Sequence, residues 1–472
     1  MRHVYTLAAA LACATISSPA PGQAPKSSRP LTKWDTLAHD ILRELIEINT
    51  QESSGSTANA AKALAARLRT AGFPDSDVVV IENASKKGNL VARLRSRNAV
   101  KKPILLLSHI DVVEAKPEDW TLPPYTFVEK DGNFYGRGVA DNKDDAAIDV
   151  ALIIRLKSEG FVPDRDIIVA ATTDEEGGAA NGVDYILQHR PALLNAEFAF
   201  NEGGGGRVED GKNISHDVQA SEKKYQDYRL EATNPGGHSS RPIKDNAITQ
   251  LADALVKVGA FDFPVHLNEV TRAYFERSVS LVDPEMGDAM RRIVKNPLDA
   301  TAAAKLSTDP GYNSQLRTSC VATMLDGGHA PNALPQRARA NVNCRILPDE
   351  SLEDVLKTLQ RVIGGAKVVV TRTGSDAQDS PPSPLTKELM GQVERITQQM
   401  WPGLPVIPTM STGATDGKYL RNKGIPTYGV MGQFYGDSNA HGMNERIPQQ
   451  GFYDSAEFVY RLVKSVTRPI VN

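Results

Sequence analysis

A histidine and an aspartate stand two residues apart where an apolar run ends. The run reads "ILLLSHID", and its last three residues are His109, Ile110 and Asp111. Side chains two positions apart on an extended chain point to the same side. The aspartate can therefore accept the second ring N–H of the histidine and fix its tautomer. We interpret the pair as a metal ligand and the residue that orients it.

Further acidic and imidazole residues stand at the ends of other apolar runs. They are Asp141, Glu175, Glu176, Glu202 and His441. In open α/β sheets, ligand-binding groups gather at the carboxyl ends of the strands. Imidazole and carboxylate without thiolate suit zinc first, with manganese or cobalt as substitutes, and one carboxylate can bridge two ions. The combination favours a metal site, whereas we expect Asp144 and Asp145 to be solvated.

The elements that would position these residues form an α/β sandwich. Helical spacing of apolar residues over 31–73 is followed by alternating strand and helix patterns up to about residue 202. The strands read as continuous apolar runs, which is typical of strands covered on both faces and joined by helical crossovers. The fold class is therefore α/β, with an α/β/α sandwich as the catalytic domain.

A second pattern begins near residue 218. Its order, β-α-β-β-α-β, is that of the ferredoxin-like unit. We predict an inserted α+β lid or dimerisation domain over 218–376, and a catalytic domain made of 25–217 and 377–472. Residues 263–315 are more than a compact small domain needs, and we expect them to line or cap the cleft.

Composition excludes some classes of partner. The net charge of −3 gives no broad basic field for nucleic acid, and no later segment is apolar for long enough to span a membrane. Residues 1–24 have the basic start, short apolar run and small residues of a secretory signal peptide. We expect a secreted or periplasmic protein. A lipoprotein signal that uses Cys13 is the alternative.

Two cysteines remain after the signal peptide, Cys320 and Cys344. They stand in two strand-like runs joined by a turn-rich connection, so they could pair across neighbouring antiparallel strands in an oxidising compartment. The alternative is two separately buried thiols, which we favour.

A set of motifs resembles those of the two-zinc aminoacylase and carboxypeptidase family. The family includes acetylornithine deacetylase, succinyl-diaminopimelate desuccinylase, glutamate carboxypeptidase and related dipeptidases. The motifs are "SHIDVVEA", "FYGRGVADNKDD", "TTDEEGG", "NEGGG", "NPGGHSSRP", "NALPQRARANVNCRILPDE", "STGATDGKYL" and "HGMNERI". The resemblance extends from about Leu31 to the C-terminus.

The resemblance implies a pair of zinc ions. One would be held by His109, Asp141 and Glu202, and the other by Asp141, Glu176 and His441, with Asp141 as the bridge. Glu175 is then free to take a proton from the shared water as the general base and to deliver it to the leaving amine. Asp111 completes the catalytic group.

The small domain is implied to recognise the substrate. His238 would stabilise the oxyanion, reaching the site from the partner subunit of a homodimer. Arg345 offers a fork for a carboxylate, Asn332 a hydrogen bond, and Gly413 a backbone N–H.

These inferences predict an exported zinc-dependent peptidase that cleaves the amide bond before the C-terminal residue of small peptides. The alternative within enzymes is an N-acyl amino acid amidohydrolase, since the same residues serve both. A binding protein that has lost catalysis is disfavoured because a pure binder has no use for a free base at Glu175.

Overall fold

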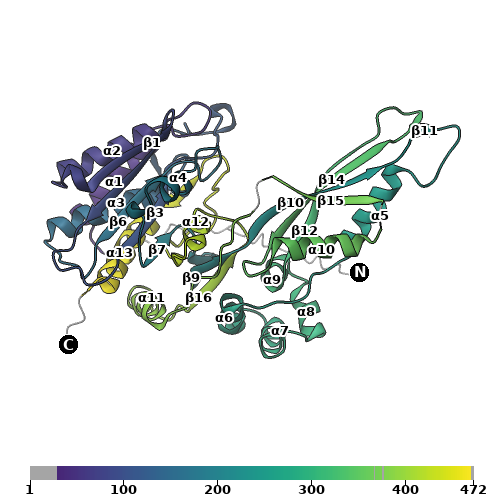
Figure 1. Ribbon diagram of the computed structural model, residues 1–472. Helices are drawn as coiled ribbons and strands as arrows, with labels where there is room; N and C mark the ends of the chain where they lie inside the picture. The colour runs from purple at the N-terminus through teal and green to yellow at the C-terminus, as the bar shows by residue number, and fades with distance from the viewer. Residues whose placement is uncertain (1–28, 366, 375–376, 469–472) are drawn as a thin grey trace, which may run out of the picture.

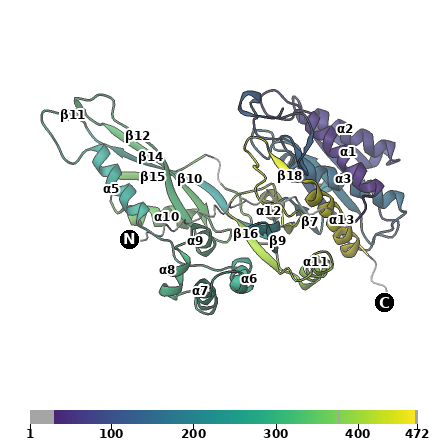
Figure 2. The ribbon, with the colours of Figure 1, turned by 180° about the vertical axis from the view of Figure 1, so that it is seen from behind.

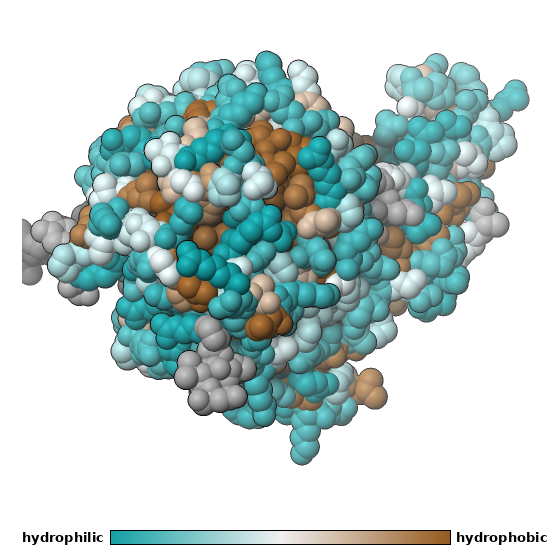
Figure 3. Space-filling view, turned by 60° about the vertical axis from the view of Figure 1, so that its left-hand side comes forward, coloured by the Kyte–Doolittle hydropathy of each residue, from teal (hydrophilic) through white to brown (hydrophobic). Residues whose placement is uncertain are grey.

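The protein consists of a larger α/β body and an elongated small domain, as Figures 1 and 2 show. This computed structural model describes residues 29–365, 367–374 and 377–468. The predicted signal peptide and Cys13 lie outside these residues. No helix within the described ranges has the length and apolarity that a membrane crossing requires. Hydrophilic side chains predominate on the face seen in Figure 3, with apolar ones scattered among them.

A nine-stranded mixed sheet forms the centre of the larger body. Strands β3, β6 and β7 run parallel to one another, and β17 is parallel to β7. The sheet in spatial order is β1 (Val78–Ala84), β2 (Lys87–Leu94), β6 (Ile167–Thr172), β3 (Ile104–His109), β7 (Phe198–Asn201), β17 (Thr427–Gly429), β9 (Lys212–Glu222) and β16 (Val406–Ser411), with β8 (Gly205–Glu209) beside β9.

Helices cover both faces of this sheet, so the predicted α/β/α sandwich is confirmed. Alternate residues of β3 belong to different cores, Leu106 to one and Leu105 with Leu107 to the other, because successive side chains of a strand point to opposite faces. The first face carries α1 (Lys33–Glu47), α2 (Thr57–Thr70), α3 (Lys143–Ser158), α11 (Lys387–Met400) and α13 (Gln449–Val466); the second carries α4 (Gly182–His189) and α12 (Gly417–Asn422).

The remaining short elements surround these layers. A three-stranded sheet has the order β18 (Arg446–Pro448), β5 (Asn133–Tyr135), β4 (Val128–Lys130). The 3-10 turns are η1 (Asp75–Asp77), η2 (Pro117–Asp119), η3 (Pro191–Leu193) and η4 (Val279–Leu281).

The small domain has the predicted ferredoxin-like order. Along the chain come β10 (Lys224–Thr233), α5 (Ala247–Gly259), β12 (Ser319–Gly327), β14 (Arg337–Ile346), α10 (Leu352–Ile363) and β15 (Val368–Thr373). The strands form an antiparallel sheet ordered β12-β14-β10-β15. Both helices pack against its apolar side, where Tyr228, Leu251 and Leu359 are buried in one cluster. A two-stranded extension, β11 (Gly237–His238) with β13 (Ala333–Leu334), forms the outer tip.

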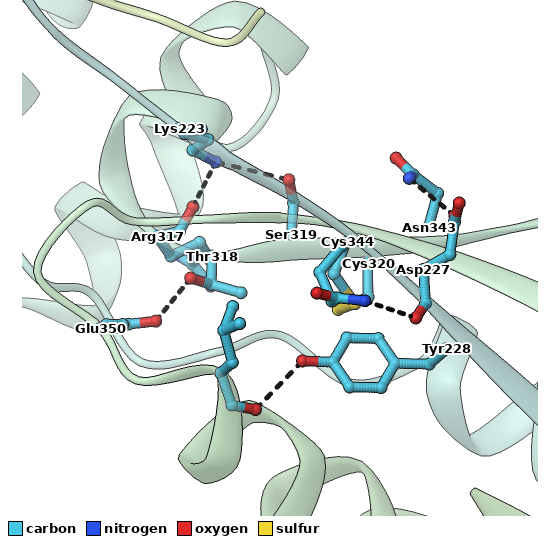
Figure 4. Close-up of a disulfide and its surroundings, with 12 residues drawn as sticks. Lys223, Asp227, Tyr228, Arg317, Thr318, Ser319, Cys320, Asn343, Cys344 and Glu350 are labelled. Carbon is cyan, nitrogen blue, oxygen red and sulfur yellow. Dashed lines mark hydrogen bonds between the residues drawn. A yellow bond between two sulfur atoms is a disulfide. The ribbon is translucent and has the colours of Figure 1, made fainter. Parts of the chain in front are cut away.

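The chain passes from the central sheet to the small sheet at Lys223, the single residue between β9 and β10. Its Nζ donates to the carbonyl oxygen of Arg317 at 2.7 Å and to Ser319 Oγ at 3.4 Å, as Figure 4 shows. The connection is therefore tied to the start of β12. The predicted domain limits stay a prediction.

The long insertion in the small domain does not line the cleft. It folds into α6 (Glu269–Ser278), α7 (Pro284–Lys295), α8 (Ala300–Leu306) and α9 (Pro310–Leu316). These helices share a core of their own and reach β16, where Arg277 donates to the carbonyl oxygen of Val406 at 3.0 Å and Gln315 to that of Met410 at 2.9 Å. The expectation of a cap over the cleft was wrong, because the edge of the central sheet offers the insertion unpaired backbone groups and apolar surface.

Cys320 and Cys344 form a disulfide, which Figure 4 shows. They lie directly opposite each other on the antiparallel strands β12 and β14. Our preference for two separate thiols was wrong, because register brings the two Cα atoms to 4.1 Å, and register depends on the whole sheet.

Candidate metal centre and substrate cleft

Three neighbouring parallel strands end at the same edge of the central sheet. His109 is the last residue of β3, Glu175 and Glu176 follow β6, and Glu202 follows β7. Because parallel strands point the same way, their carboxyl ends place these side chains together. Asp141 is supplied by the loop before α3, and His441 by the loop before β18.

The two histidines meet the two oxygens of Asp141. His109 Nε2 is 3.0 Å from Oδ1 and His441 Nε2 is 3.0 Å from Oδ2. On the outer sides, His109 Nε2 lies 3.4 Å from Glu202 Oε2 and His441 Nε2 lies 2.9 Å from Glu176 Oε1. The pattern is two imidazole–carboxylate clusters that share one aspartate. This pattern matches the two ligand sets that the family resemblance implies. Which residue binds which ion stays a prediction.

Glu175 lies close enough to be counted with these groups. Donor atoms of His109, Glu175 and Glu202 lie within 4.8 Å of one another, as do those of His109, Asp141 and Glu176. Proximity alone does not separate a ligand from a base, so the role of Glu175 as the general base stays a prediction.

The electrostatics of the cluster fit cations. Burial and the charge of Glu202 raise the pKa of Glu175 to about 9, and burial also raises the pKa of Glu202. Hydrogen bonds to Asp141 and Glu176 raise the pKa of His441 to about 10. Burial opposes ionisation of Asp141, but hydrogen bonds from the two histidines outweigh it and lower its pKa. Without a metal ion, the carboxylates of the cluster are stabilised by binding protons, which shows that the site favours positive charge. Hard or borderline divalent ions match this set of N and O donors.

Asp111 orients the centre differently from our expectation. His109 Nδ1 is 3.1 Å from the backbone oxygen of Asp111, whereas its distance to Oδ1 is 3.7 Å. The carboxylate of Asp111 instead accepts the backbone N–H groups of Glu175 at 3.2 Å and Glu176 at 3.0 Å. The expectation that this carboxylate accepts the ring N–H was wrong, because the strand turns after His109 and the main-chain carbonyl takes that place. Either acceptor leaves Nε2 facing the centre.

A buried ion pair that we did not single out from the sequence holds the two loops of the centre. Arg137 donates to Glu445 Oε2 at 2.7 Å, and the other oxygen of Glu445 accepts the N–H of Ala140 at 2.8 Å. Arg137 also donates to the carbonyl oxygen of Gly442 at 2.9 Å. The pair therefore joins the loop of Asp141 to the loop of His441. The sequence offered one indication of this pair: an arginine in the motif "GRG" and a glutamate in the motif "NER" carry opposite charges.

A cleft of about 770 Å³ opens beside the centre. Glu175 and Glu176 line one part of it, and Arg345 of β14 lines the small-domain side. Arg345 donates to the carbonyl oxygen of Thr412 at 3.1 Å, and its guanidinium lies 4.7 Å from the ring centre of Tyr225. The structure therefore brings the predicted carboxylate-binding arginine to the same cavity as the predicted base.

Gly413 also lines the cleft, but its backbone N–H donates to Ser411 Oγ at 3.0 Å. A substrate carboxylate would have to replace that contact, so the predicted role of Gly413 needs a local rearrangement.

Two of the predicted site residues lie far from the metal centre in the structure. His238 and Asn332 are exposed at the outer tip of the small domain, where the N–H of Ser239 donates to the carbonyl oxygen of Asn332 at 3.0 Å. Figures 1 and 2 place this tip, marked β11, at the end of the molecule away from β7. Neither residue reaches the metal centre of its own subunit. The predicted roles of His238 at the oxyanion and of Asn332 in substrate binding therefore require a second subunit and stay predictions.

Comparison with known proteins supports the chemistry of the centre. The sequence model described as "Peptidase family M20/M25/M40" matches residues 105–465. The chain is 28% identical over 409 residues to "Probable carboxypeptidase S-like 2" of Dictyostelium discoideum, which covers 84% of this chain and 78% of the relative. It is 27% identical over 376 residues to the human "N-fatty-acyl-amino acid synthase/hydrolase PM20D1", covering 77% of this chain and 74% of the relative.

Among solved structures, the fold is similar to an M20 family metallo-carboxypeptidase, Sso-CP2, from Sulfolobus solfataricus. The TM-score is 0.65 at 18% identity, covering 91% of this chain and 99% of that one. At this identity the likeness supports the fold.

Proposed function

Because the chain belongs to peptidase family M20/M25/M40, and is thereby a metallohydrolase of peptide or amide bonds, we propose that it is an exported zinc-dependent peptidase. It removes the C-terminal amino acid from small peptides. The observation that carries the proposal is the position of Arg345, which shares a cleft with Glu175 and Glu176. A guanidinium there suits the free α-carboxylate of the residue that leaves.

The lining of the cleft favours peptides over long acyl chains. Charged side chains such as Lys224, Asp227 and Lys418 surround it, together with Tyr225 and Tyr419. Among the described residues of the lining, no aliphatic side chain is larger than alanine. A long acyl chain gains affinity by burying apolar surface, and this wall offers little of it. The N-acyl amino acid amidohydrolase remains the alternative for short acyl groups.

The chain's own groups divide the work of hydrolysis. When bound, a pair of divalent ions would lower the pKa of the attacking water and polarise the scissile carbonyl; the residues that would hold them are His109, Asp141, Glu176, Glu202 and His441. Glu175 takes a proton from that water and delivers it to the leaving amine. Asp111 holds the backbone of Glu175 and Glu176 in place for both steps.

We also propose a homodimer formed through the small domain. Its edge strand β12 exposes Val321, Met324 and Leu325, with 61%, 71% and 71% of their surface accessible. An exposed strand edge with apolar side chains is suited to pairing with another chain. In such a dimer, His238 of the tip is free to approach the partner's cleft and donate to the oxyanion.

The experiment is a substrate panel. Dipeptides, their C-terminal amides, and acetyl, chloroacetyl and longer N-acyl amino acids are compared with and without chelator and added Zn²⁺, Mn²⁺ or Co²⁺. We expect turnover of dipeptides with a free carboxylate, loss of turnover on chelation, and the fullest recovery with zinc. Faster hydrolysis of the N-acyl amino acids would establish the alternative, and equal rates on the amides would remove the role of Arg345.

A further inference from the structure

Two aspartates that we expected to be solvated are buried behind the metal centre. Asp144 and Asp145 open helix α3, and only 2% and 6% of their surfaces are exposed. They line a second cavity of about 210 Å³, here called the rear chamber, together with Asp141, Glu202 and Gln433. The earlier expectation was wrong because α3 is covered on all sides in its first turn, as the burial of its neighbours shows. The rear chamber adjoins the metal centre through Asp141 and Glu202, and none of these five residues lines the substrate cleft.

The rear chamber has buried oxygen atoms without partners. Asp144 Oδ1, Asp145 Oδ1 and Gln433 Oε1 have no hydrogen-bond partner within the described part of the chain. Gln433 is 3% exposed, and its Nε2 donates to the other oxygen of Asp144. The amide thereby leaves Oε1 free. Among the buried side-chain atoms of the lining, the donor Asn142 Nδ2 also has no partner within the described residues. A buried polar atom without a partner costs free energy unless an ion or water satisfies it.

Among the described residues, no lysine or arginine forms an ion pair with either carboxylate, and His109 is the basic group whose charge acts on Asp145. The nearest basic residue in the sequence, Lys143, directs its Nζ to the carbonyl oxygens of Leu45 at 2.8 Å and Ile48 at 2.9 Å. Arg137 is paired with Glu445. Burial raises the pKa of Asp144 to about 7 and that of Asp145 well above its usual range, as it must when a carboxylate loses water without gaining a positive charge.

The ions of the metal centre do not supply that charge. Two divalent ions would carry four positive charges, and the centre already has five carboxylates to set against them: Asp111, Asp141, Glu175, Glu176 and Glu202. The carboxylates of Asp144 and Asp145 therefore have no balancing positive charge in the rear chamber. An unpaired charge in such a low-dielectric interior is costly.

We propose that the rear chamber binds one further cation, of the hard, oxygen-preferring class, through Asp144, Asp145 and Gln433. The donors are carboxylate and amide oxygens without nitrogen or sulfur, which suits Ca²⁺, Mg²⁺, Na⁺ or K⁺ more than zinc. The volume of about 210 Å³ leaves room for several water molecules to complete the shell. The cation joins the start of α3 to the segment of Gln433 and so fixes the rear wall of the metal centre.

The test uses the zinc-loaded enzyme, freed of excess metal and held in choline chloride. Calcium, magnesium, sodium and potassium chlorides are titrated at constant ionic strength while heat of binding and melting temperature are recorded. We expect one of these cations to bind at one site per chain and to raise the melting temperature by a few degrees, since a ligand that binds only the folded state stabilises it.

Asp145→Asn keeps the shape of the side chain and removes its charge, so its affinity for the cation falls at least tenfold. The matched control is Asp77→Asn. Asp77 is another buried aspartate, with 7% exposure, but it pairs with Arg95 and does not line the rear chamber, so the cation binds this variant as tightly as wild type. Gln433→Leu serves as a second test of the same oxygen set.

Three results would overturn the proposal. They are equal melting temperatures in all salts with no heat of binding, which leaves the two acids protonated and the chamber filled with water; undiminished affinity in Asp145→Asn; and equal losses of cation affinity in the Asp145 and Asp77 variants. None of these readouts depends on turnover, so a different substrate would not affect the conclusion.

Discussion

The carboxylate of Asp111 accepts the backbone N–H of Glu176 at 3.0 Å. The same carboxylate accepts the N–H of Glu175 at 3.2 Å, so one side chain fixes the main chain of the predicted base and of a predicted ligand. Asp111 therefore acts on the glutamates that follow β6 as well as on the histidine that precedes it. This link is the physical basis of the first prediction.

Asp111→Asn removes one of the two acceptor oxygens that hold the loop. We expect kcat to fall 10- to 100-fold, the range seen when residues behind a metal ligand are changed, with a small change in KM because Asp111 does not line the substrate cleft. Steady-state kinetics with elemental analysis measure both. The exposed Asp119→Asn is the control. A rise in KM alone, with kcat intact, would contradict a positioning role.

Glu175→Gln keeps the size of the side chain and removes its basicity. We expect kcat to fall by a factor on the order of 10² to 10⁴, the usual contribution of a general base, while the enzyme retains its full metal content. Elemental analysis separates a base from a ligand, which matters here because Glu175 lies within ligand distance of His109 and Glu202. Loss of an ion from this variant would make Glu175 a ligand. The exposed Glu118→Gln serves as control.

Arg345→Lys retains the positive charge and loses the two-pronged geometry. We expect kcat/KM for dipeptides to fall by roughly 10-fold or more, equivalent to about 1.4 kcal/mol or more, and rates on C-terminal amides to change little. The ratio of free to amidated substrate therefore declines. An unchanged ratio would show that Arg345, held by the carbonyl oxygen of Thr412 and Tyr225, has a structural role alone.

Stability should depend on pH through Lys223. Burial lowers the pKa of this lysine to about 7, whereas the pKa in an unfolded chain is about 10.4. Between these values the unfolded state binds more protons, so this residue makes the free energy of unfolding rise as pH increases from 7 to 10. In Lys223→Met, we expect a smaller rise over that window and parallel curves below pH 7. Urea unfolding at several pH values measures the slopes, with the exposed Lys387→Met as control. Equal slopes in wild type and Lys223→Met would refute the assignment.

Local sequence patterns predicted the layers of the fold and the gathering of four residues of the metal centre. His109, Glu175, Glu176 and Glu202 each stand at the end of an apolar strand, and parallel strands necessarily bring those ends to one edge. The order of elements after residue 218 likewise predicted the antiparallel sheet of the small domain.

What the sequence determined by itself was therefore which residue types stand at which strand ends, because alternation and periodicity are local properties of the chain. The tertiary structure alone decided the rest: that Asp144 and Asp145 are buried, that Asp111 binds the backbone beyond β6, that Cys320 meets Cys344 in register, and that His238 lies at the outer tip. Burial, register and the pairing of distant loops depend on which elements pack together, and the neighbours that impose them lie far away in the sequence.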